Sequence, residues 1–153
     1  MTPYDRLREL GLELMTPAVP IANYVPFVLT GPFLYLSGQG PRKADGTLHT
    51  GKVGADVSKE EAYVHARTTG LNLISVAHVA LGDLSRVNRV VKLLGMVNGT
   101  HDFIEHPQVV NGASDLFVSV FGEAGRHARS AVGMGSLPGN ITVEIEAILE
   151  VAL

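Results

Sequence analysis

The chain contains 153 residues and no cysteine. Without thiols it can form no disulfide, no thiolate nucleophile and no cysteine-ligated zinc site. Basic residues are also few, because twelve Lys and Arg stand against fifteen Asp and Glu, for a formal charge of −3. These basic residues are scattered, so the chain lacks the electrostatic pattern of a nucleic-acid-binding protein. We therefore expect no nucleic-acid partner.

Long apolar runs are absent as well. No stretch approaches the roughly 20 apolar residues that a transmembrane helix needs, so we expect no membrane association. The first residues, Met1 to Asp5, are neither basic nor followed by an apolar run. We therefore expect no signal peptide and a cytoplasmic location. The length predicts one domain, residues 1–153, and an apolar fraction of 46% favours an oligomer.

Hydrophobic patterning predicts the order of elements along the chain. A short N-terminal helical extension is followed by strand, strand, helix, strand, helix, strand and strand. Ser58 and Glu61 form the pattern of a capping box, and Pro107 suits the first turn of a helix. Both long helices have one apolar face, and one sheet with both helices on one side is the simplest α+β solution. The predicted helices span 4–10, 58–82 and 107–122, and the predicted strands span 24–30, 33–39, 86–97, 128–135 and 141–151.

The last two strands were the basis for a first site hypothesis. Residues 141–151 alternate between apolar and polar side chains, and turn residues at 137–140 predict a hairpin with residues 128–135. In that register Arg129 lies on the same face as Glu144, about 13 Å away along the strand. The guanidinium could then fork onto the carboxylate of a small ligand. The alternative is that Arg129 merely neutralises glutamates on a solvated face.

Three segments of the chain resemble the RidA family, also called YjgF/YER057c/UK114. They are Tyr24 with 37–41 (Ser-Gly-Gln-Gly-Pro), Val110-Asn111, and the block from Ala128 through Leu137-Pro138 to Ala147. The resemblance implies a chorismate mutase-like fold of the bacillus type and a homotrimer with clefts between subunits. It also implies hydrolysis of reactive enamines and imines, such as 2-aminoacrylate, to 2-oxo acids and ammonia.

The same resemblance assigns roles to individual residues. Arg129 would hold the substrate carboxylate, and Glu144 would orient or activate the attacking water. Tyr24, Gly38 and Asn111 would line the cleft. No metal or organic cofactor is implied. The chain is longer than typical deaminase members and has Ala131 where the best-known members carry cysteine, which indicates a divergent subgroup.

Other functions stay open on sequence alone. A non-catalytic trimer that binds small carboxylate metabolites could use the same arginine. An endoribonuclease ranks third, because this acidic chain offers few phosphate contacts. The segment 101–106 has the residue types of a metal site but no helical pair of histidines four residues apart, so we expect no metal. His127 could touch the cleft, although a surface-loop histidine is the favoured interpretation.

Overall fold

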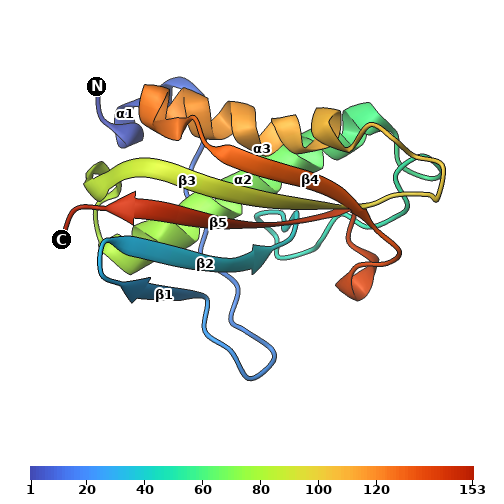
Figure 1. Ribbon diagram of the computed structural model, residues 1–153, viewed down its shortest axis with the longest axis horizontal. Coiled ribbons are helices and arrows are strands. Elements are labelled where there is room, and N and C mark those ends of the chain that lie inside the picture. The colour runs from blue at the N-terminus through green and yellow to red at the C-terminus, as the bar shows by residue number, and fades with distance from the viewer.

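The computed structural model describes residues 1–153, which form one mixed sheet of five strands in the order β1-β2-β5-β3-β4 (Figure 1). The order of elements along the chain agrees with the sequence prediction, so the α+β class is confirmed. Three short 3-10 helices, at Leu84–Arg86, Gly122–Gly125 and Pro138–Asn140, were not predicted. The main elements are α1 (Pro3–Glu9), β1 (Phe27–Thr30), β2 (Phe33–Gln39), α2 (Lys59–Leu81), β3 (Val87–Asn98), α3 (His106–Phe121), β4 (Ala128–Met134) and β5 (Val143–Val151).

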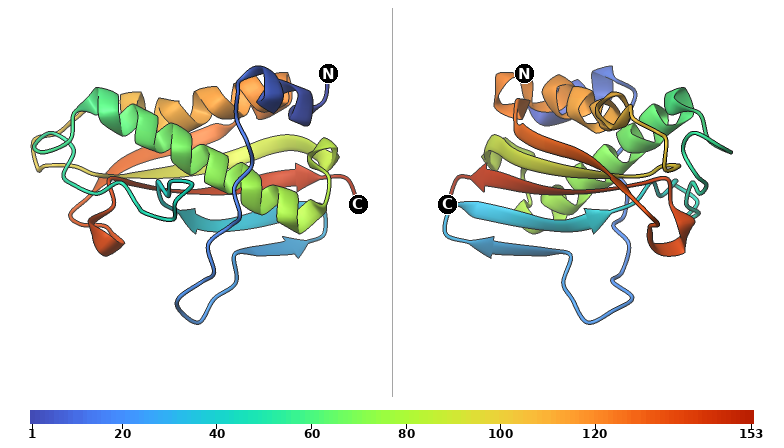
Figure 2. Two further views of the ribbon diagram at one scale, coloured as in Figure 1. Left: turned by 180° about the vertical axis from the view of Figure 1, so that it is seen from behind. Right: turned by 45° about the vertical axis from the view of Figure 1, so that its right-hand side comes forward.

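The two long helices cover one face of the sheet. In Figure 1 they lie behind the strands, and the view from behind in Figure 2 shows α2 crossing the sheet. The core lies between these layers, and the alternating apolar residues of β5 all point into it, as predicted. No helix covers the opposite face, which we call the open face. None of the helices combines the length and hydropathy that a membrane crossing requires. Fully buried core residues include Leu34, Leu93, Val97, Ile145, Leu149, Ile74, Leu116 and Phe117.

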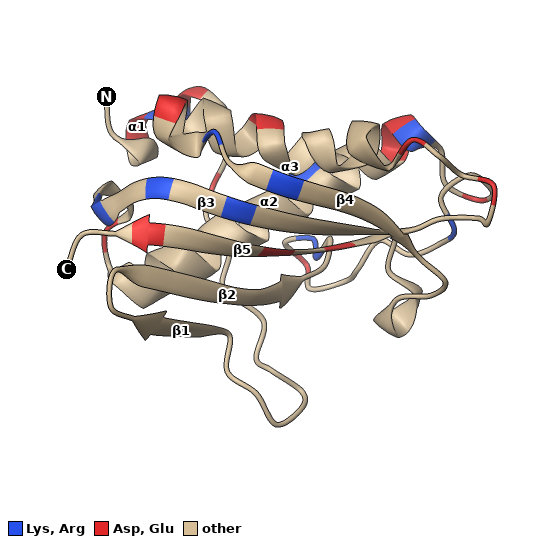
Figure 3. Ribbon diagram, in the orientation of Figure 1, with Lys and Arg blue, Asp and Glu red and all other residues tan.

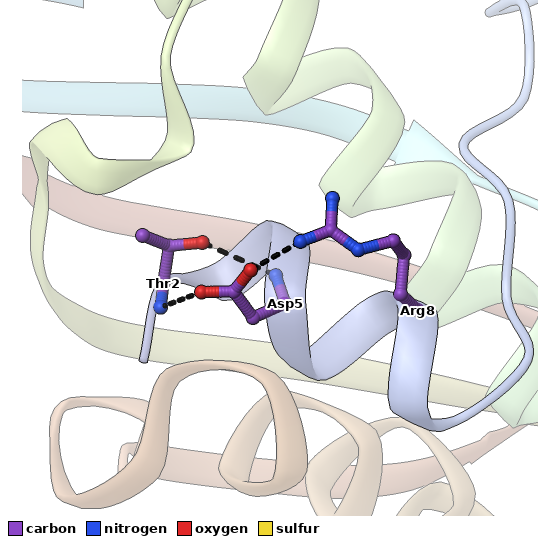
Figure 4. Close-up of polar contacts among 3 residues, drawn as sticks. All are labelled: Thr2, Asp5 and Arg8. Carbon is purple, nitrogen blue, oxygen red and sulfur yellow. Dashed lines mark hydrogen bonds and ion pairs between the residues drawn. The ribbon is translucent and has the colours of Figure 1, made fainter.

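Local signals in the sequence explain where the helices begin and end. The Thr2 and Asp5 side chains accept each other's backbone N–H groups at the start of α1, and Arg8 pairs with Asp5 (Figure 4). The predicted box at Ser58 and Glu61 has the same reciprocal bonds, 3.0 and 3.2 Å long, at the start of α2. These bonds satisfy N–H groups that the first helical turn leaves free.

The predicted C-terminal hairpin is wrong. β4 and β5 do not pair, because β3 lies between them and pairs in parallel with β4 and antiparallel with β5. The helical crossover through α3 brings β4 parallel to β3. Residues 135–142 then carry the chain across the end of β3, where the sequence had suggested a tight turn.

The same arrangement corrects the predicted positions of Arg129 and Glu144. Arg129 is aligned with Leu93, which is buried under the helices, whereas Glu144 is aligned with Met96. Because neighbouring side chains in a strand alternate between faces, Leu93 and Met96 point to opposite sides of the sheet. Arg129 therefore lies on the helix side and Glu144 on the open face.

Candidate functional site

Arg129 is held beneath α3 in an orientation that leaves one side of its guanidinium open. Its Nη1 donates to Asn111 Oδ1 at 2.8 Å and to Ser114 Oγ at 3.1 Å. These two bonds use both Nη1 protons, while Nε and Nη2 make no hydrogen bond within the chain. No Asp or Glu forms an ion pair with Arg129. Nε and Nη2 are the pair of donors that grips a carboxylate side-on.

His127 supports this arginine through Ser114. Its Nδ1 donates a hydrogen bond to the Gly125 carbonyl at 2.6 Å. Nε2 is then unprotonated and accepts a hydrogen bond from the Ser114 hydroxyl at 2.8 Å. We assign this tautomer from the bonding pattern, since a carbonyl can only accept. Burial lowers the pKa of His127, the hydrogen bond to the Gly125 carbonyl opposes this shift, and the nearby Arg129 charge adds to it, so the net effect favours the neutral ring. His127 lies in the loop before β4, as the favoured sequence interpretation has it, but it is partly buried and hydrogen-bonded to Ser114.

The sequence reasoning missed Ser114, although a signal for it was present. Asn111 and Ser114 are three residues apart in α3 and therefore lie on one side of the helix. Both of their oxygens face the same nitrogen of Arg129. Burial lowers the pKa of Arg129 and Asp115 opposes this shift, but an arginine stays protonated in either case.

Glu144 sits against the backbone of β2 on the open face. A Cβ atom built on Gly38 would lie 2.6 Å from Glu144 Oε2, so a larger residue at this position would have to displace the carboxylate. The β2–β5 register shifts between Leu36 and Gln39, and this bulge turns Gly38 toward Glu144. Burial raises the pKa of Glu144, and the negative charge of Glu146 raises it further.

Tyr24 and Gly38 line the same cavity of about 290 Å³ next to the Glu144 side of the sheet. The Tyr24 side chain is 51% exposed. The remaining lining includes the apolar segment before Tyr24, with Val19 and Ile21, and residues from the loops around Leu48 and Ile141. The structure thus brings Gly38 next to Glu144 and into one cavity with Tyr24, and separately brings Asn111 together with Arg129.

The candidate site is therefore divided into two half-sites. We call Arg129, Asn111, Ser114 and His127 the arginine half-site, and Glu144, Gly38 and Tyr24 the glutamate half-site. Because they belong to opposite faces of the sheet, they do not share a cleft in one chain. Along the strands, Figure 3 shows basic residues on β3 and β4 and acidic residues on β5.

The residues that resembled a metal site are engaged elsewhere. Asp102 Oδ1 accepts a hydrogen bond from Thr100 Oγ1 at 2.7 Å. Glu105 Oε1 forms an ion pair with Lys59 Nζ at 3.0 Å. No group of three or more His, Asp or Glu side chains lies close enough to hold a metal ion. No set of residues in the chain points to a particular organic cofactor. The expectation that the protein uses no cofactor stays a prediction.

Comparison with known proteins places the chain in a family. Residues 4–149 match a family model described as "YjgF/chorismate_mutase-like, putative endoribonuclease". The chain is 47% identical to protein TCP17 of Trypanosoma cruzi over 145 residues, which cover 94% of this chain and 91% of TCP17.

Two crystal structures show the same fold. One, of "a putative endoribonuclease" from Shewanella oneidensis MR-1, is 38% identical with a TM-score of 0.96, and the match covers 99% of this chain and 100% of that one. The other, RidA from Psychrobacter sp. PAMC 21119, is 27% identical with a TM-score of 0.61, and the match covers 88% and 93% of the two chains. The resemblance to RidA is thus confirmed, and the chain belongs to the YjgF/chorismate mutase-like family.

Proposed function

We propose that the protein hydrolyses reactive enamines and imines of 2-amino acids, such as 2-aminoacrylate, to 2-oxo acids and ammonia. One observation carries this proposal: Arg129 is fixed by two neutral oxygens through Nη1, and Nε and Nη2 are left without partners. A charged group oriented in this way is a receptor for a carboxylate. Every substrate of the proposed class carries that carboxylate next to the reacting carbon.

A second copy of the chain would complete the site. Arg129 and Glu144 lie on opposite sides of the sheet, so the glutamate half-site facing a bound substrate must come from another subunit. The open face carries apolar side chains suited to such contact, since Val28 is 50%, Tyr35 44% and Val132 38% exposed. We propose a homotrimer with one cleft at each interface, the assembly that the family resemblance implies. A cytoplasmic location also stays a prediction.

The proposed chemistry needs only modest help from the protein. An enamine first takes a proton at its terminal carbon and becomes an iminium ion, whose C2 is already electrophilic. Glu144 accepts a proton from water while the oxygen attacks C2, and then returns this proton to the nitrogen of the tetrahedral adduct. The C–N bond breaks as the adduct's hydroxyl releases its proton to solvent, which replaces the proton taken up by the enamine. The products are a 2-oxo acid and ammonia. A carboxylate whose pKa is raised is a better base at neutral pH than an ordinary one.

The direct test is ammonia release from 2-aminoacrylate generated in situ. We expect acceleration by the wild type and at least a hundredfold loss in kcat/KM for Arg129→Ala, about 2.7 kcal/mol of transition-state stabilisation. Arg8→Ala is the matched control, because Arg8 is exposed and pairs only with Asp5. If the wild type does not exceed the uncatalysed rate, the proposed reaction is wrong.

The alternative is a trimer that binds small carboxylates without turning them over. It uses the same arginine half-site, so binding of 2-oxobutyrate by wild type but not by Arg129→Ala would fit both functions. Only the enzyme requires Glu144 for turnover. If the wild type and Glu144→Gln both bind 2-oxobutyrate and the imine decays at the uncatalysed rate with either protein, the binding protein is the better account. An endoribonuclease ranks below both, because the −3 charge and the glutamates of β5 repel an RNA backbone.

A further inference from the structure

A single carboxylate lies beside Arg129 and does not pair with it. Burial lowers the pKa of Arg129 and the negative charge of Asp115 opposes this shift, so the two charges are near one another. None of the ion pairs in the chain joins them. Both residues line one cavity of about 250 Å³ where α3 meets the start of β4, and its other lining residues are Ser114, Val118, Arg126 and His127. A cation and an anion therefore share this cavity with a gap between them.

The Asp115 carboxylate is held in position from α2. Tyr63 donates a hydrogen bond from its hydroxyl to Asp115 Oδ2 at 2.6 Å. This bond raises the pKa of the Tyr63 hydroxyl, so the group keeps its proton and stays a donor at neutral pH. Asp115 Oδ1 has no hydrogen-bond partner within the chain. Arg126, the other basic residue of the cavity, forms an ion pair with Glu123 at 3.2 Å and does not pair with Asp115.

An α-amino acid, or the iminium ion derived from it, has charges that match this pair. Its nitrogen and its carboxylate carbon are bound to the same carbon atom and lie about 2.5 Å apart. A charge-assisted hydrogen bond at each end adds about 2.8 Å. Two protein groups that hold both ends of such a ligand must therefore be farther apart than a direct ion pair. Arg129 and Asp115 meet this condition, because they line the same cavity without pairing.

We propose that Asp115 accepts a hydrogen bond from the protonated nitrogen of the substrate, so that the arginine half-site recognises the carboxylate and the cationic nitrogen together. This inference rests on the proposed function, in which Arg129 holds the carboxylate. A negative charge beside the nitrogen favours the iminium ion over the neutral imine, and C2 of the iminium ion is the more electrophilic. With both groups held, C2 keeps one orientation toward the attacking water. The 2-oxo acid product lacks the nitrogen and is held less tightly.

The test compares two ligands of equal length, 2-aminobutyrate and 2-hydroxybutyrate, which differ in the charge of the group on C2. Binding is measured by calorimetry at neutral pH with the full chain in its native assembly. We expect the wild type to bind the amino acid about tenfold more tightly. Asp115→Asn should remove this preference without weakening the binding of the hydroxy acid. Tyr63→Phe, which removes the hydroxyl that holds Asp115, should reduce the preference to about threefold.

The ammonia assay gives a second measurement on the same variants. Asp115→Asn should lower kcat/KM for 2-aminoacrylate about tenfold, because the charge that favours the iminium ion is lost. Asp45→Asn is the matched control for both measurements, because Asp45 is exposed and lies outside the cavity. Its Oδ1 accepts hydrogen bonds from Thr47, and asparagine keeps that oxygen. We expect this variant to match the wild type in both affinities and in rate.

Other roles for Asp115 predict different results. If Asp115 only ties α2 to α3 through Tyr63, its replacement lowers stability and leaves the ligand preference unchanged. If it only tempers the charge of Arg129, Asp115→Asn tightens both ligands equally. Either result would overturn the proposed contact, as would equal binding of the two ligands by the wild type, while the arginine clamp would stand. If Asp115→Asn does not fold, Tyr63→Phe decides. If neither ligand binds to the wild type, the proposed function is wrong as well.

Discussion

Glu144 rests on the backbone of Gly38, with its Oε2 in the space that any side chain at residue 38 would fill. The carboxylate lies on the open face, and the bulge in β2 turns residue 38 toward it. A strand without the bulge would turn residue 38 to the helix side.

Replacing Gly38 by alanine tests this contact. The added methyl group would push the Glu144 carboxylate away, so we expect kcat/KM for 2-aminoacrylate to fall at least tenfold, about 1.4 kcal/mol. Gly135→Ala is the matched control, because a Cβ there meets nothing within 4 Å. Equal activity of the two variants in the ammonia assay would show that the position of Glu144 is unimportant.

Removing the Ser114 hydroxyl should loosen Arg129 without touching the chemistry. Ser114→Ala deletes one of the two bonds to Nη1, and a hydrogen bond of this kind contributes about 1 kcal/mol. We therefore expect KM and the dissociation constant of 2-oxobutyrate to rise about fivefold while kcat changes little. His127→Phe should shift both constants in the same direction. A fall in kcat with unchanged KM would contradict a positioning role.

The rate should depend on the protonation of Glu144. A general base works when deprotonated, and burial together with Glu146 raises the pKa of Glu144 above its ordinary 4.5. We expect kcat/KM to decline as pH falls through this raised value, with the acidic limb lying above pH 4.5. The pH profile of Glu144→Gln should lack that limb. An identical limb in both proteins would assign it to another group.

Acid should destabilise the fold through His65. Burial, and then the stacked His49 ring 3.9 Å away, lower the pKa of His65 from 6.5 to about 4. Between these values the unfolded chain binds the proton and the folded chain does not. Stability is therefore complete above pH 6.5, declines as pH falls toward 4, and loses about 3 kcal/mol in total.

Urea unfolding at several pH values checks this prediction. The stability of His65→Gln should vary less between pH 6.5 and 4 than that of the wild type. His101→Gln should follow the wild type, because His101 is exposed. If His65→Gln keeps the full dependence, the loss of stability comes from other groups.

Mixed assemblies test whether two chains share each cleft. Arg129→Ala and Glu144→Gln chains should each be inactive alone. When the two variants are refolded together in equal amounts, the chains assemble at random. About a quarter of the clefts then contain both an intact Arg129 and an intact Glu144. We expect that fraction of the wild-type rate. No recovery, with mixed assemblies verified by mass spectrometry, would place both residues of a working site in one chain.

Local structure could be predicted from the sequence because local residues determine it. The Ser58 capping box and the alternation of β5 each act over a few residues, and both were confirmed. The position of β3 between β4 and β5 depends on a crossover through α3. Alternation shows which side chains of a strand are buried, but it does not identify the neighbouring strand.

The candidate site shows the same limit. The false hairpin placed Arg129 and Glu144 on one face, and motif resemblance then assigned their roles. Asn111 was found by resemblance, while Ser114 could have been found from its helical spacing. The bond between His127 and Ser114 could not be predicted, because it depends on how the chain leaves α3 at Gly122–Gly125.

The position of β3 between β4 and β5 has a consequence for mixed populations of chains. Since each chain offers one half-site on each side of its sheet, in the proposed assembly it participates in two clefts at once. A chain that still assembles but has lost both half-sites would therefore impair its neighbours as well as itself. In an equal mixture of normal chains and such chains, random assembly leaves about a quarter of the clefts intact, so activity would fall below half and the defect would behave as dominant.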